Sequence, residues 1–410
     1  MSLPDNSARV PLHPAGEGSP LEVLRVFLGL GLSSFGGPVA HLGFFREAFV
    51  VRRRWIDETR FAQLLALCQF LPGPASSQLG FALGLLRAGW LGGLAAFLGF
   101  TLPSAVMMLA LALMLPQVTG ALAQAWVHGL KLVAVSVVAA ALPGMARQLC
   151  AEPRRASLAA AAVVAVSWSA SPWAQLVVIA AGALAGALLL RDASPLPTAG
   201  LGVRHGAGAG AVLLGVFALL LAMALLMGGQ AGGLAAIAQP FYRAGALVFG
   251  GGHVVLPLLE ASLAAPAGGL PRDEFLAGYG AAQALPGPMF ALSAFLGARL
   301  AQDISMLAGA VTALVAMFLP GLLLVAGALP LWGRVVRKPA AAGAVAGVNA
   351  AVVGVLAAAL YDPVWISAVR GPSDLAIAAV GFTLLVAWRL SALWVVLWCL
   401  GASTAVALAG

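Results

Sequence analysis

The stretch Gln69-Phe70-Leu71-Pro72-Gly73-Pro74 decides the fold, because it returns later in the chain as Gln283-Ala284-Leu285-Pro286-Gly287-Pro288. A second motif, Phe35-Gly36-Gly37, returns as Phe249-Gly250-Gly251, and both pairs are separated by 214 residues. Chance matches would not preserve such a spacing, so the motifs indicate an internal duplication. We predict an N-terminal tail (1–20), a first repeat (21–192), a linker with a connecting helix (193–234) and a second repeat (235–410).

The composition places both repeats in a lipid bilayer. Of the 410 residues 62% are hydrophobic and 9% charged, with a mean hydropathy of +1.01, whereas soluble domains carry about 25% charged residues. Apolar segments long enough to cross ~30 Å of hydrocarbon recur from Leu21 to the C-terminus. The sequence therefore predicts an all-α polytopic membrane protein.

The basic residues indicate how the chain is oriented. The net charge is +8, but Lys and Arg lie in short loops between apolar segments, which the positive-inside rule explains without nucleic acid as a partner. The loop after the first motif is strongly basic, whereas its counterpart carries Arg272 beside Asp273 and Glu274. The basic residues of the first loop are Arg46, Arg52, Arg53, Arg54 and Arg60. We therefore expect two inverted repeats, an arrangement typical of secondary transporters.

Glycine and proline interrupt the first two apolar segments of each repeat. The breaks are Gly36-Gly37-Pro38 and Pro72-Gly73-Pro74 in the first repeat, and Gly250-Gly251-Gly252 and Pro286-Gly287-Pro288 in the second. A continuous helix tolerates such residues badly, so each segment reads as two half-helices. Crossing and re-entrant arrangements are both compatible with the breaks, and the re-entrant one makes the loop charges consistent.

Broken helices in a membrane imply a polar cavity, because hydrocarbon cannot satisfy the freed backbone groups. A half-helix that begins at the break points its N–H groups and positive dipole end at that cavity, which suits an anion. The first repeat also has hydroxyls and an amide in this turn. The candidate anion-binding residues are Phe35, Gly36, Gly37, Gln69, Pro72, Gly73, Pro74, Ser76, Ser77, Gln78, Phe249, Gly250, Gly251, Gln283, Pro286, Gly287 and Pro288.

Ionisable residues inside apolar segments are expensive and usually functional. His253 and Glu260 are candidates for proton coupling, and Glu260 can alternatively pair with Arg243. Arg25 and Lys131 are further charged candidates. A lone His or an interfacial Arg is also compatible with a structural role. We expect the tryptophans at the segment ends to form interfacial belts; these are Trp55, Trp126, Trp332 and Trp365.

At these motifs the sequence resembles the chromate ion transporter (CHR) family in its long two-domain form. The resemblance rests on Ser34 to Pro38, on Trp55 to Pro74 and on the copies at Phe249 to Gly252 and Gln283 to Pro288. It implies export of chromate across the bacterial inner (plasma) membrane, driven by the proton motive force and conferring chromate resistance. Chromate or a related oxyanion, protons and lipid are the implied partners.

Other functions are compatible with the residues themselves. Sulfate has the same charge and shape class as chromate, so a sulfate transporter is an alternative, as is an anion channel. A membrane enzyme acting on lipid phosphate would need a nucleophile with an acid or base, or a metal cluster, beside the cavity. The five His residues are dispersed and no His/Asp/Glu group has metal-ligand spacing, so we expect neither enzyme activity nor a metal or cofactor. Homo-oligomerisation stays open.

Overall fold

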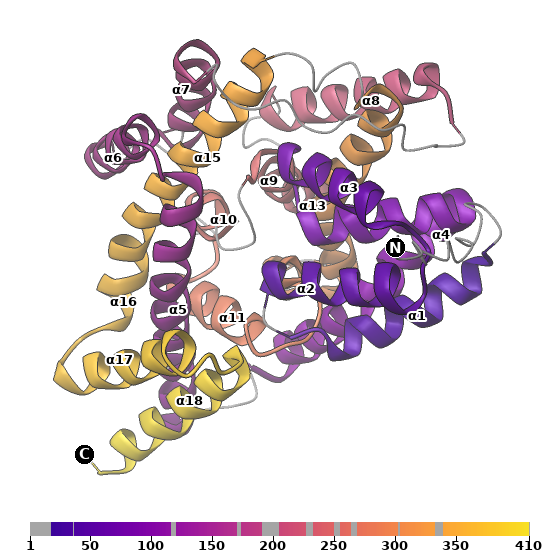
Figure 1. The fold of residues 1–410 in the computed structure, drawn as a ribbon. Coiled ribbons are helices and arrows are strands. Elements are labelled where there is room, and N and C mark those ends of the chain that lie inside the picture. The colour runs from indigo at the N-terminus through magenta and orange to yellow at the C-terminus, as the bar shows by residue number, and fades with distance from the viewer. Residues whose placement is uncertain are drawn as a thin grey trace, which may run out of the picture.

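The computed structural model describes residues 18–35, 37–115, 120–169, 174–190, 205–226, 233–249, 255–263, 269–301, 304–332 and 339–409. These residues form helices and their connections, with no strand among them (Figure 1). The predicted tail up to residue 17, Gly36, Gly250, Gly251 and His253 lie outside the described residues. The predicted all-α polytopic fold is confirmed.

The two broken segments of the first repeat fold back as hairpins. Helices α1 (Pro20–Ser33) and α2 (Gly37–Arg46), with the π-helical turn Glu47–Arg52, run antiparallel, and Phe27 at the middle of α1 stacks on Phe49 at 5.0 Å. Ser19 caps α1 by accepting the Glu22 N–H, which satisfies one free donor of the first turn.

The second hairpin returns to the side from which it started. Helix α3 (Glu58–Phe70) leads to the Pro72-Gly73-Pro74 break, after which α4 (Ala75–Met114) begins. Arg87 of α4 lies 3.4 Å from Glu22 at the start of α1 and 5.2 Å from the ring of Trp55, just before α3. Both hairpins therefore open on one face of the molecule.

A sharp turn inside α4 follows the second hairpin of the first repeat. Ala88 and Gly89 are non-helical, with φ +68° at Gly89, and Gly84 then packs closely against the Gly92 backbone. The second repeat makes the same turn between α12 (Leu292–Leu300) and α13 (Met306–Ala328), where Gly297 packs on Gly309. Small residues allow this close backbone approach.

The second repeat copies the hairpins in the opposite direction. Its helices are α9 (Gly233–Leu247), α10 (Val255–Leu263), α11 (Arg272–Ala282) and the short turn Met289–Ala291 that opens α12. The returning helices of the two repeats run antiparallel, because Phe97 contacts Phe318 at 5.2 Å while His205 contacts both Trp90 and the Ala326 carbonyl. The predicted inversion is confirmed.

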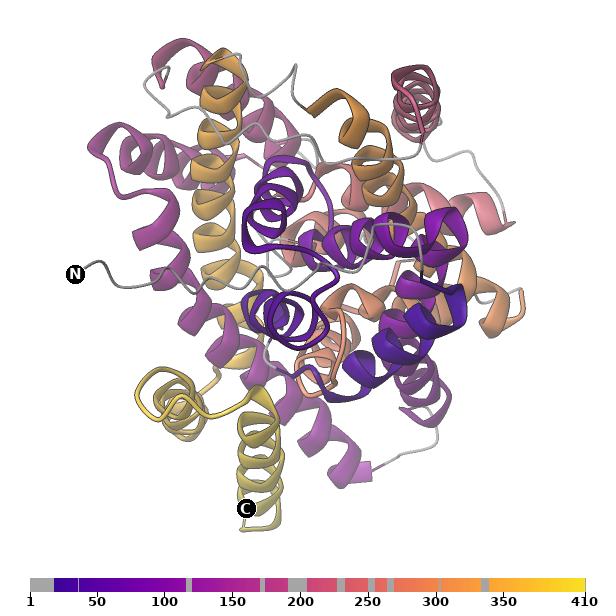
Figure 2. The same cartoon turned by 45° about the vertical axis from the view of Figure 1, so that its right-hand side comes forward.

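The remaining helices of each repeat pack against helices of the other repeat. The long helix α5 (Gly120–Leu149) of the first repeat packs against α17 (Pro372–Val386) and α18 (Ala392–Ala409) of the second. Its counterpart α15 (Pro339–Ala359) packs against α6 (Pro153–Trp168) and α7 (Ala174–Leu189) of the first. Figures 1 and 2 show α5 and α15 running side by side, with α17 and α18 at one end and α6 and α7 at the other.

The connecting helix is α8 (Ala207–Leu226), which packs against α13 and α9. The chain bends between α15 and α17 through the turns Leu360–Trp365 and Ile366–Ala368. Within the described residues, five helices are long and apolar enough to cross a membrane, and shorter apolar helices accompany them. Their exposed side chains are largely Leu, Val and Trp, as expected of a surface in contact with lipid.

The two faces on which the hairpins open differ in charge. The first repeat's face carries the basic loop residues named above, and the other face carries acidic ones: Glu260, Asp273, Glu274, Asp362 and Asp374. The positive-inside rule assigns the basic face to the cytoplasm, and we call the opposite one the outer face. One tryptophan prediction is wrong: Trp332 is buried and packs edge-on against Phe70, because the end of α13 lies inside the first repeat's core.

Candidate functional site

The tips of the hairpins from the two repeats touch each other through reciprocal backbone hydrogen bonds. Gly73 N–H of the first Pro-Gly-Pro donates to the Val248 carbonyl at 2.7 Å, and Gly287 N–H of the second donates to the Ser34 carbonyl at 2.9 Å. Val248 and Ser34 directly precede the two Phe-Gly-Gly motifs. The breaks of one repeat therefore contact the breaks of the other in two pairs, which together we call the tip junction (Ser34, Gly73, Val248 and Gly287).

Glycine is required at both central positions of the junction. Gly73 has φ +121° and Gly287 has φ +90°, a region that L side chains avoid. Space is also lacking, because a methyl group built on Gly287 would lie 3.0 Å from Ser104 Oγ and 3.1 Å from the Phe100 carbonyl oxygen. The flanking prolines hold the backbone extended and lack N–H groups that would need partners.

Each Pro-Gly-Pro ends at an uncapped helix N-terminus. Among the residues that the structure describes, no side chain caps the start of α4 after Pro74 or the turn that begins after Pro288. The first N–H groups of both helices therefore have no side-chain acceptor, and their dipoles direct positive potential at the junction. This electrostatic arrangement favours an anion.

Buried hydroxyls without partners lie on the elements that form the junction. Within the described residues, Ser34 Oγ, Ser77 Oγ and Thr101 Oγ1 are buried and make no hydrogen bond. A buried hydroxyl left unpaired costs about 1–3 kcal/mol, so a ligand that accepts a hydrogen bond from it is stabilising. These hydroxyls can donate to an oxyanion. A narrow crevice at the second Pro-Gly-Pro is lined by Ser104, Met108 and the residues around Gly287.

His41 ties the first hairpin to the junction. Its Nε2 donates to the Ser34 carbonyl at 3.1 Å, the same oxygen that accepts Gly287 N–H. The ring packs edge-on against Phe100 at 5.2 Å, and its Nδ1 is buried without a partner. The sequence reading did not select His41, although the position of this residue one turn after the first break was a usable signal.

The sequence-predicted residues are only partly brought together. Phe35 and Phe249 are half-buried next to the junction, and Ser76 is buried in the first turn of α4. Gln78 does not face an anion with its amide nitrogen, because Nε2 donates to the carbonyls of Pro72 and Gly321. It fastens the break to α13 instead.

The paired glutamines differ despite their equal place in the repeats. Gln69 is exposed at the end of α3, whereas Gln283 is half-buried and its amide contacts Met289 Sδ at 2.8 Å. Arg25 is exposed in a shallow groove on the cytoplasmic face with Glu22 and Arg53. Arg25 thus lies apart from the tip junction.

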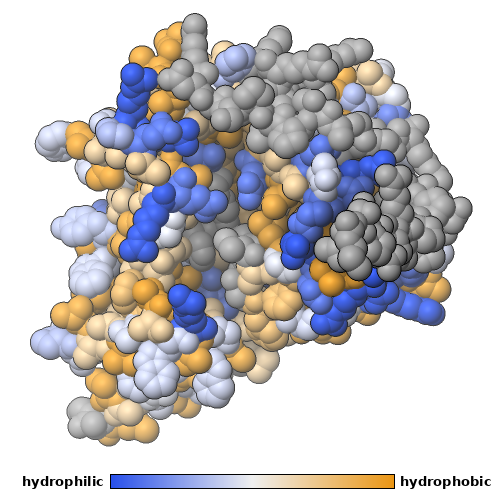
Figure 3. All heavy atoms as spheres, viewed as in Figure 1, coloured by the Kyte–Doolittle hydropathy of each residue, from blue (hydrophilic) through white to orange (hydrophobic). Residues whose placement is uncertain are grey.

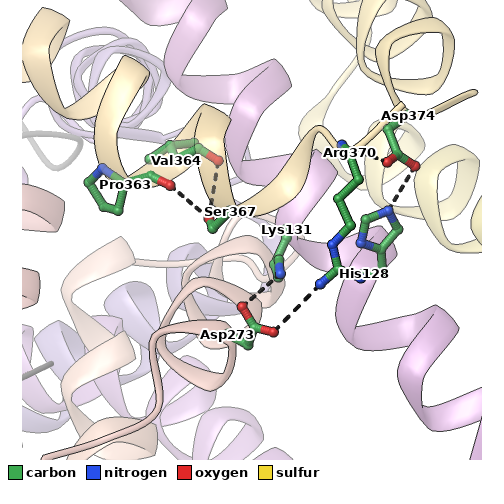
Figure 4. Close-up of polar contacts among 8 residues, drawn as sticks. All are labelled: His128, Lys131, Asp273, Pro363, Val364, Ser367, Arg370 and Asp374. Atoms are coloured by element: carbon green, nitrogen blue, oxygen red, sulfur yellow. Dashed lines mark hydrogen bonds and ion pairs between the residues drawn. The ribbon is translucent and has the colours of Figure 1, made fainter. Parts of the chain in front are cut away.

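Glu260 and Lys131 belong to the outer face. Glu260 is buried and accepts from Arg272 Nε at 2.8 Å, so its partner is Arg272 rather than the expected Arg243. Lys131 is 1% exposed, and its Nζ lies 2.7 Å from Asp273 Oδ1 (Figure 4). A cavity of about 360 Å³ opens beside this ion pair.

We call the contact between a hairpin helix of one repeat and the long helix of the other a seam, and the seams on the two faces differ. On the outer side α11 packs on α5, where Gly280 lies against the Leu130 carbonyl. The equivalent helices α3 and α15 make no comparable contact among the described residues. Figure 3 shows hydrophilic residues around a hollow near the middle of the molecule, and Gln69 of α3 is exposed. Within the described residues, contact between α11 and α5 therefore closes the outer seam, whereas α3 and α15 leave the cytoplasmic seam parted.

Two inverted repeats whose broken helices meet tip to tip define the architecture of a secondary transporter. Residues 21–187 and 235–404 match the family model described as chromate transporter. The chain belongs to the chromate transporter family, and the match covers both repeats.

Curated relatives share this length and organisation. A chromate transport protein of Pseudomonas aeruginosa is 31% identical over 88% of this chain and 86% of its own. A probable chromate transport protein of Synechococcus elongatus is 29% identical over 87% of each chain, and a chromate transport protein of Cupriavidus metallidurans is 26% identical over 87% of this chain and 86% of its own. No solved structure matches the fold.

Proposed function

We propose that this protein exports chromate from the cytoplasm across the bacterial inner membrane, driven by the proton motive force. The observation that carries the proposal is the tip junction, where reciprocal backbone hydrogen bonds join the breaks of the two repeats and where uncapped half-helices begin on elements that carry unpaired buried hydroxyls. The cargo is suggested by the curated relatives, which are named for chromate transport. Chromate is a tetrahedral dianion that accepts hydrogen bonds in several directions.

The junction has suitable donors for such an anion. Ser34 and Ser77 contribute hydroxyls from different hairpins, and the first turn of α4 contributes backbone N–H groups. None of these donors needs to lose a proton to bind a dianion. Hydrogen bonds to a charged partner are worth about 1.5–3 kcal/mol each, so a few of them offset much of the cost of removing the anion from water.

The parted cytoplasmic seam supports export. Chromate would reach the junction between α3 and α15 while the α5–α11 seam stays closed by Gly280 and the Lys131–Asp273 ion pair. Exchanging the two seams would then expose the junction to the outer side. Inverted repeats support such an exchange because each repeat can adopt the other's conformation.

The membrane potential supplies a driving force for a dianion. Each elementary charge is worth about 2.3 kcal/mol per 100 mV, so a potential that is negative inside favours the exit of chromate. Glu260 is our candidate among the described residues for coupling protons, because it is buried on the outer face and accepts a hydrogen bond from the Arg272 side chain. His253 remains the second proton-coupling candidate.

The test is chromate accumulation in inside-out membrane vesicles containing the protein, with and without an uncoupler. We expect accumulation that the uncoupler abolishes. Competition by excess sulfate measures how strongly the site prefers chromate over sulfate. Absence of accumulation in vesicles that contain folded protein would contradict the proposal, and complete inhibition by equimolar sulfate would make sulfate the better cargo.

A further inference from the structure

A second polar site lies on the outer face, away from the tip junction. It is lined by Gln124, Val127, His128, Lys131, Asp273 and Arg370 around the cavity of about 360 Å³. Lys131 comes from α5 of the first repeat, while Asp273 begins α11 and Arg370 precedes α17 in the second. Figure 4 shows these side chains pointing toward one another from separate elements. We call this site the outer vestibule.

Lys131 is an unusual residue at this depth. It lies eleven residues after the start of α5, which is roughly 16 Å along a helix, and its side chain is 1% exposed. A buried ammonium is costly inside a membrane protein and usually marks an ion pathway. Packing alone does not require it.

The repeat symmetry shows that the fold does not need this ion pair. The counterpart of Lys131 in α15 is Asn349, and the residue 214 positions before Asp273 is Thr59. Neither counterpart is charged, yet both repeats form the same helices. The charge pair is therefore an addition to the outer side of the molecule.

Asp273 occupies the place that an oxyanion would take. One carboxylate oxygen lies 2.7 Å from Lys131 Nζ and the other lies 3.9 Å from Arg370 Nη2. The carboxylate thus bridges two cations, as a tetrahedral dianion would do with more charge. Its side chain is 54% exposed at the first turn of α11, so it can leave without opening the core.

The other charged groups around the vestibule are already paired. His128 Nε2 donates to Asp374 Oδ1 at 2.8 Å, and Asp374 also accepts the Arg370 N–H. Arg272 pairs with Glu260 at 2.8 Å and lies 3.6 Å from Asp362, and Arg299 pairs with Glu274. Within the described part of the chain, Asp273 is therefore the acid that neutralises the side chains of both Lys131 and Arg370.

We propose that the outer vestibule is a second anion-binding site, in which Lys131 and Arg370 bind a divalent oxyanion that displaces Asp273. Asp273 acts as a built-in competitor that keeps the site closed when no anion arrives from the junction. The displacement separates α11 from α5 at the Lys131–Asp273 ion pair, which couples anion arrival to opening of the outer seam. This role of the vestibule rests on the proposed function as an anion exporter.

The first test uses purified protein in detergent and sulfate as a non-oxidising probe. Binding is measured as the sulfate-dependent rise in the unfolding temperature, with sodium chloride of equal ionic strength as the reference. Asp273→Asn removes the competitor, so we expect sulfate to bind at least threefold more tightly than in the wild type. Adding Arg370→Gln should reverse that gain. Asp362→Asn is the matched control, since it removes another exposed acid from the same face while Arg272 keeps Glu260 as its partner, and it should leave sulfate binding unchanged.

The second test separates anion binding from a structural role of the ion pair. Lys131→Met with Asp273→Asn removes both charges and leaves no unpaired buried ion. We expect this double variant to fold with near wild-type thermal stability and to lose at least tenfold in chromate transport. Transport within twofold of the wild type, or an unchanged sulfate affinity in Asp273→Asn, would overturn the proposal.

The two proposals fail in different ways. If wild-type vesicles do not accumulate chromate while Asp273→Asn still binds sulfate more tightly, the proposal for the outer vestibule is supported and the proposal of chromate export is contradicted. If wild-type vesicles accumulate chromate and Asp273→Asn binds sulfate as the wild type does, the proposal of chromate export is supported and the proposal for the outer vestibule is contradicted.

Discussion

Replacing Gly287 with alanine tests whether the tip junction holds the two repeats together. An alanine at φ +90° is strained by about 1–2 kcal/mol. Its methyl group would also lie 3.1 Å from the Phe100 carbonyl oxygen and 3.3 Å from that of Gly31. These are backbone atoms, which cannot rotate away, so overpacking adds about 1–3 kcal/mol.

The substitution also disturbs the hydrogen bond from Gly287 N–H to the Ser34 carbonyl, which is worth about 0.5–1.5 kcal/mol. Together these effects predict a loss of roughly 3–6 kcal/mol in the free energy of unfolding. Gly89→Ala is the matched control. Gly89 also has a positive φ, +68°, with ψ −158°, but a methyl group there would meet nothing within 4 Å, so only backbone strain of about 1–3 kcal/mol applies.

The assay is reversible unfolding in mixed micelles, followed by tryptophan fluorescence, with chromate accumulation measured in parallel. We expect Gly287→Ala to be less stable than Gly89→Ala by about 2–4 kcal/mol and to transport poorly. Equal stability of the two variants would refute the close packing of the tips on which the site depends.

Three further predictions concern the binding residues, the seam and the topology. Ser77→Ala should weaken chromate affinity about tenfold, by the loss of one hydrogen bond to a charged ligand, whereas Ser403→Ala, another buried and unpaired serine, should leave affinity unchanged. Gly280→Ala places a methyl group 2.0 Å from the Leu130 carbonyl oxygen, so it should part the outer seam. In a Gln283→Cys background, the substitution should raise the reactivity of the thiol toward an impermeant reagent added from outside. Unaltered reactivity would contradict the closed seam. Cysteines replacing Thr59 and Ser367 should react with that reagent from opposite sides of the membrane, and labelling of both from one side would refute the inverted topology.

The repeated motifs made the membrane architecture predictable. Equal spacing of Phe-Gly-Gly and Pro-Gly-Pro in the two halves identified the duplication, and the basic loop after the first motif indicated its inversion. Re-entrant segments were predicted by requiring consistent loop charges, and the contact of Arg87 with Glu22 and Trp55 shows that the broken segments fold back as hairpins. These features depend on local sequence and on the hydrophobicity that a bilayer requires, and both can be read from the amino-acid sequence.

Side-chain partners could not be predicted, because they depend on how distant helices are placed. Lys131 and Asp273 are 142 positions apart and meet only because α5 packs on α11. Gln78 lies in a favourable first turn, but the carbonyl of Gly321 approaches from α13 and takes its amide. Gln69 and Gln283 occupy equivalent positions with different exposure, because the two seams differ.

The position of the bound anion tests the central claim most directly. Crystals of the protein grown with chromate and measured at the chromium absorption edge would locate the metal of the oxyanion by its anomalous scattering. We expect the strongest peak at the tip junction, within hydrogen-bonding reach of Ser77 and the first turn of α4, with a second peak beside Lys131 when Asp273 is replaced by Asn. A chromium peak elsewhere in the membrane-embedded region, with the junction empty, would contradict the account.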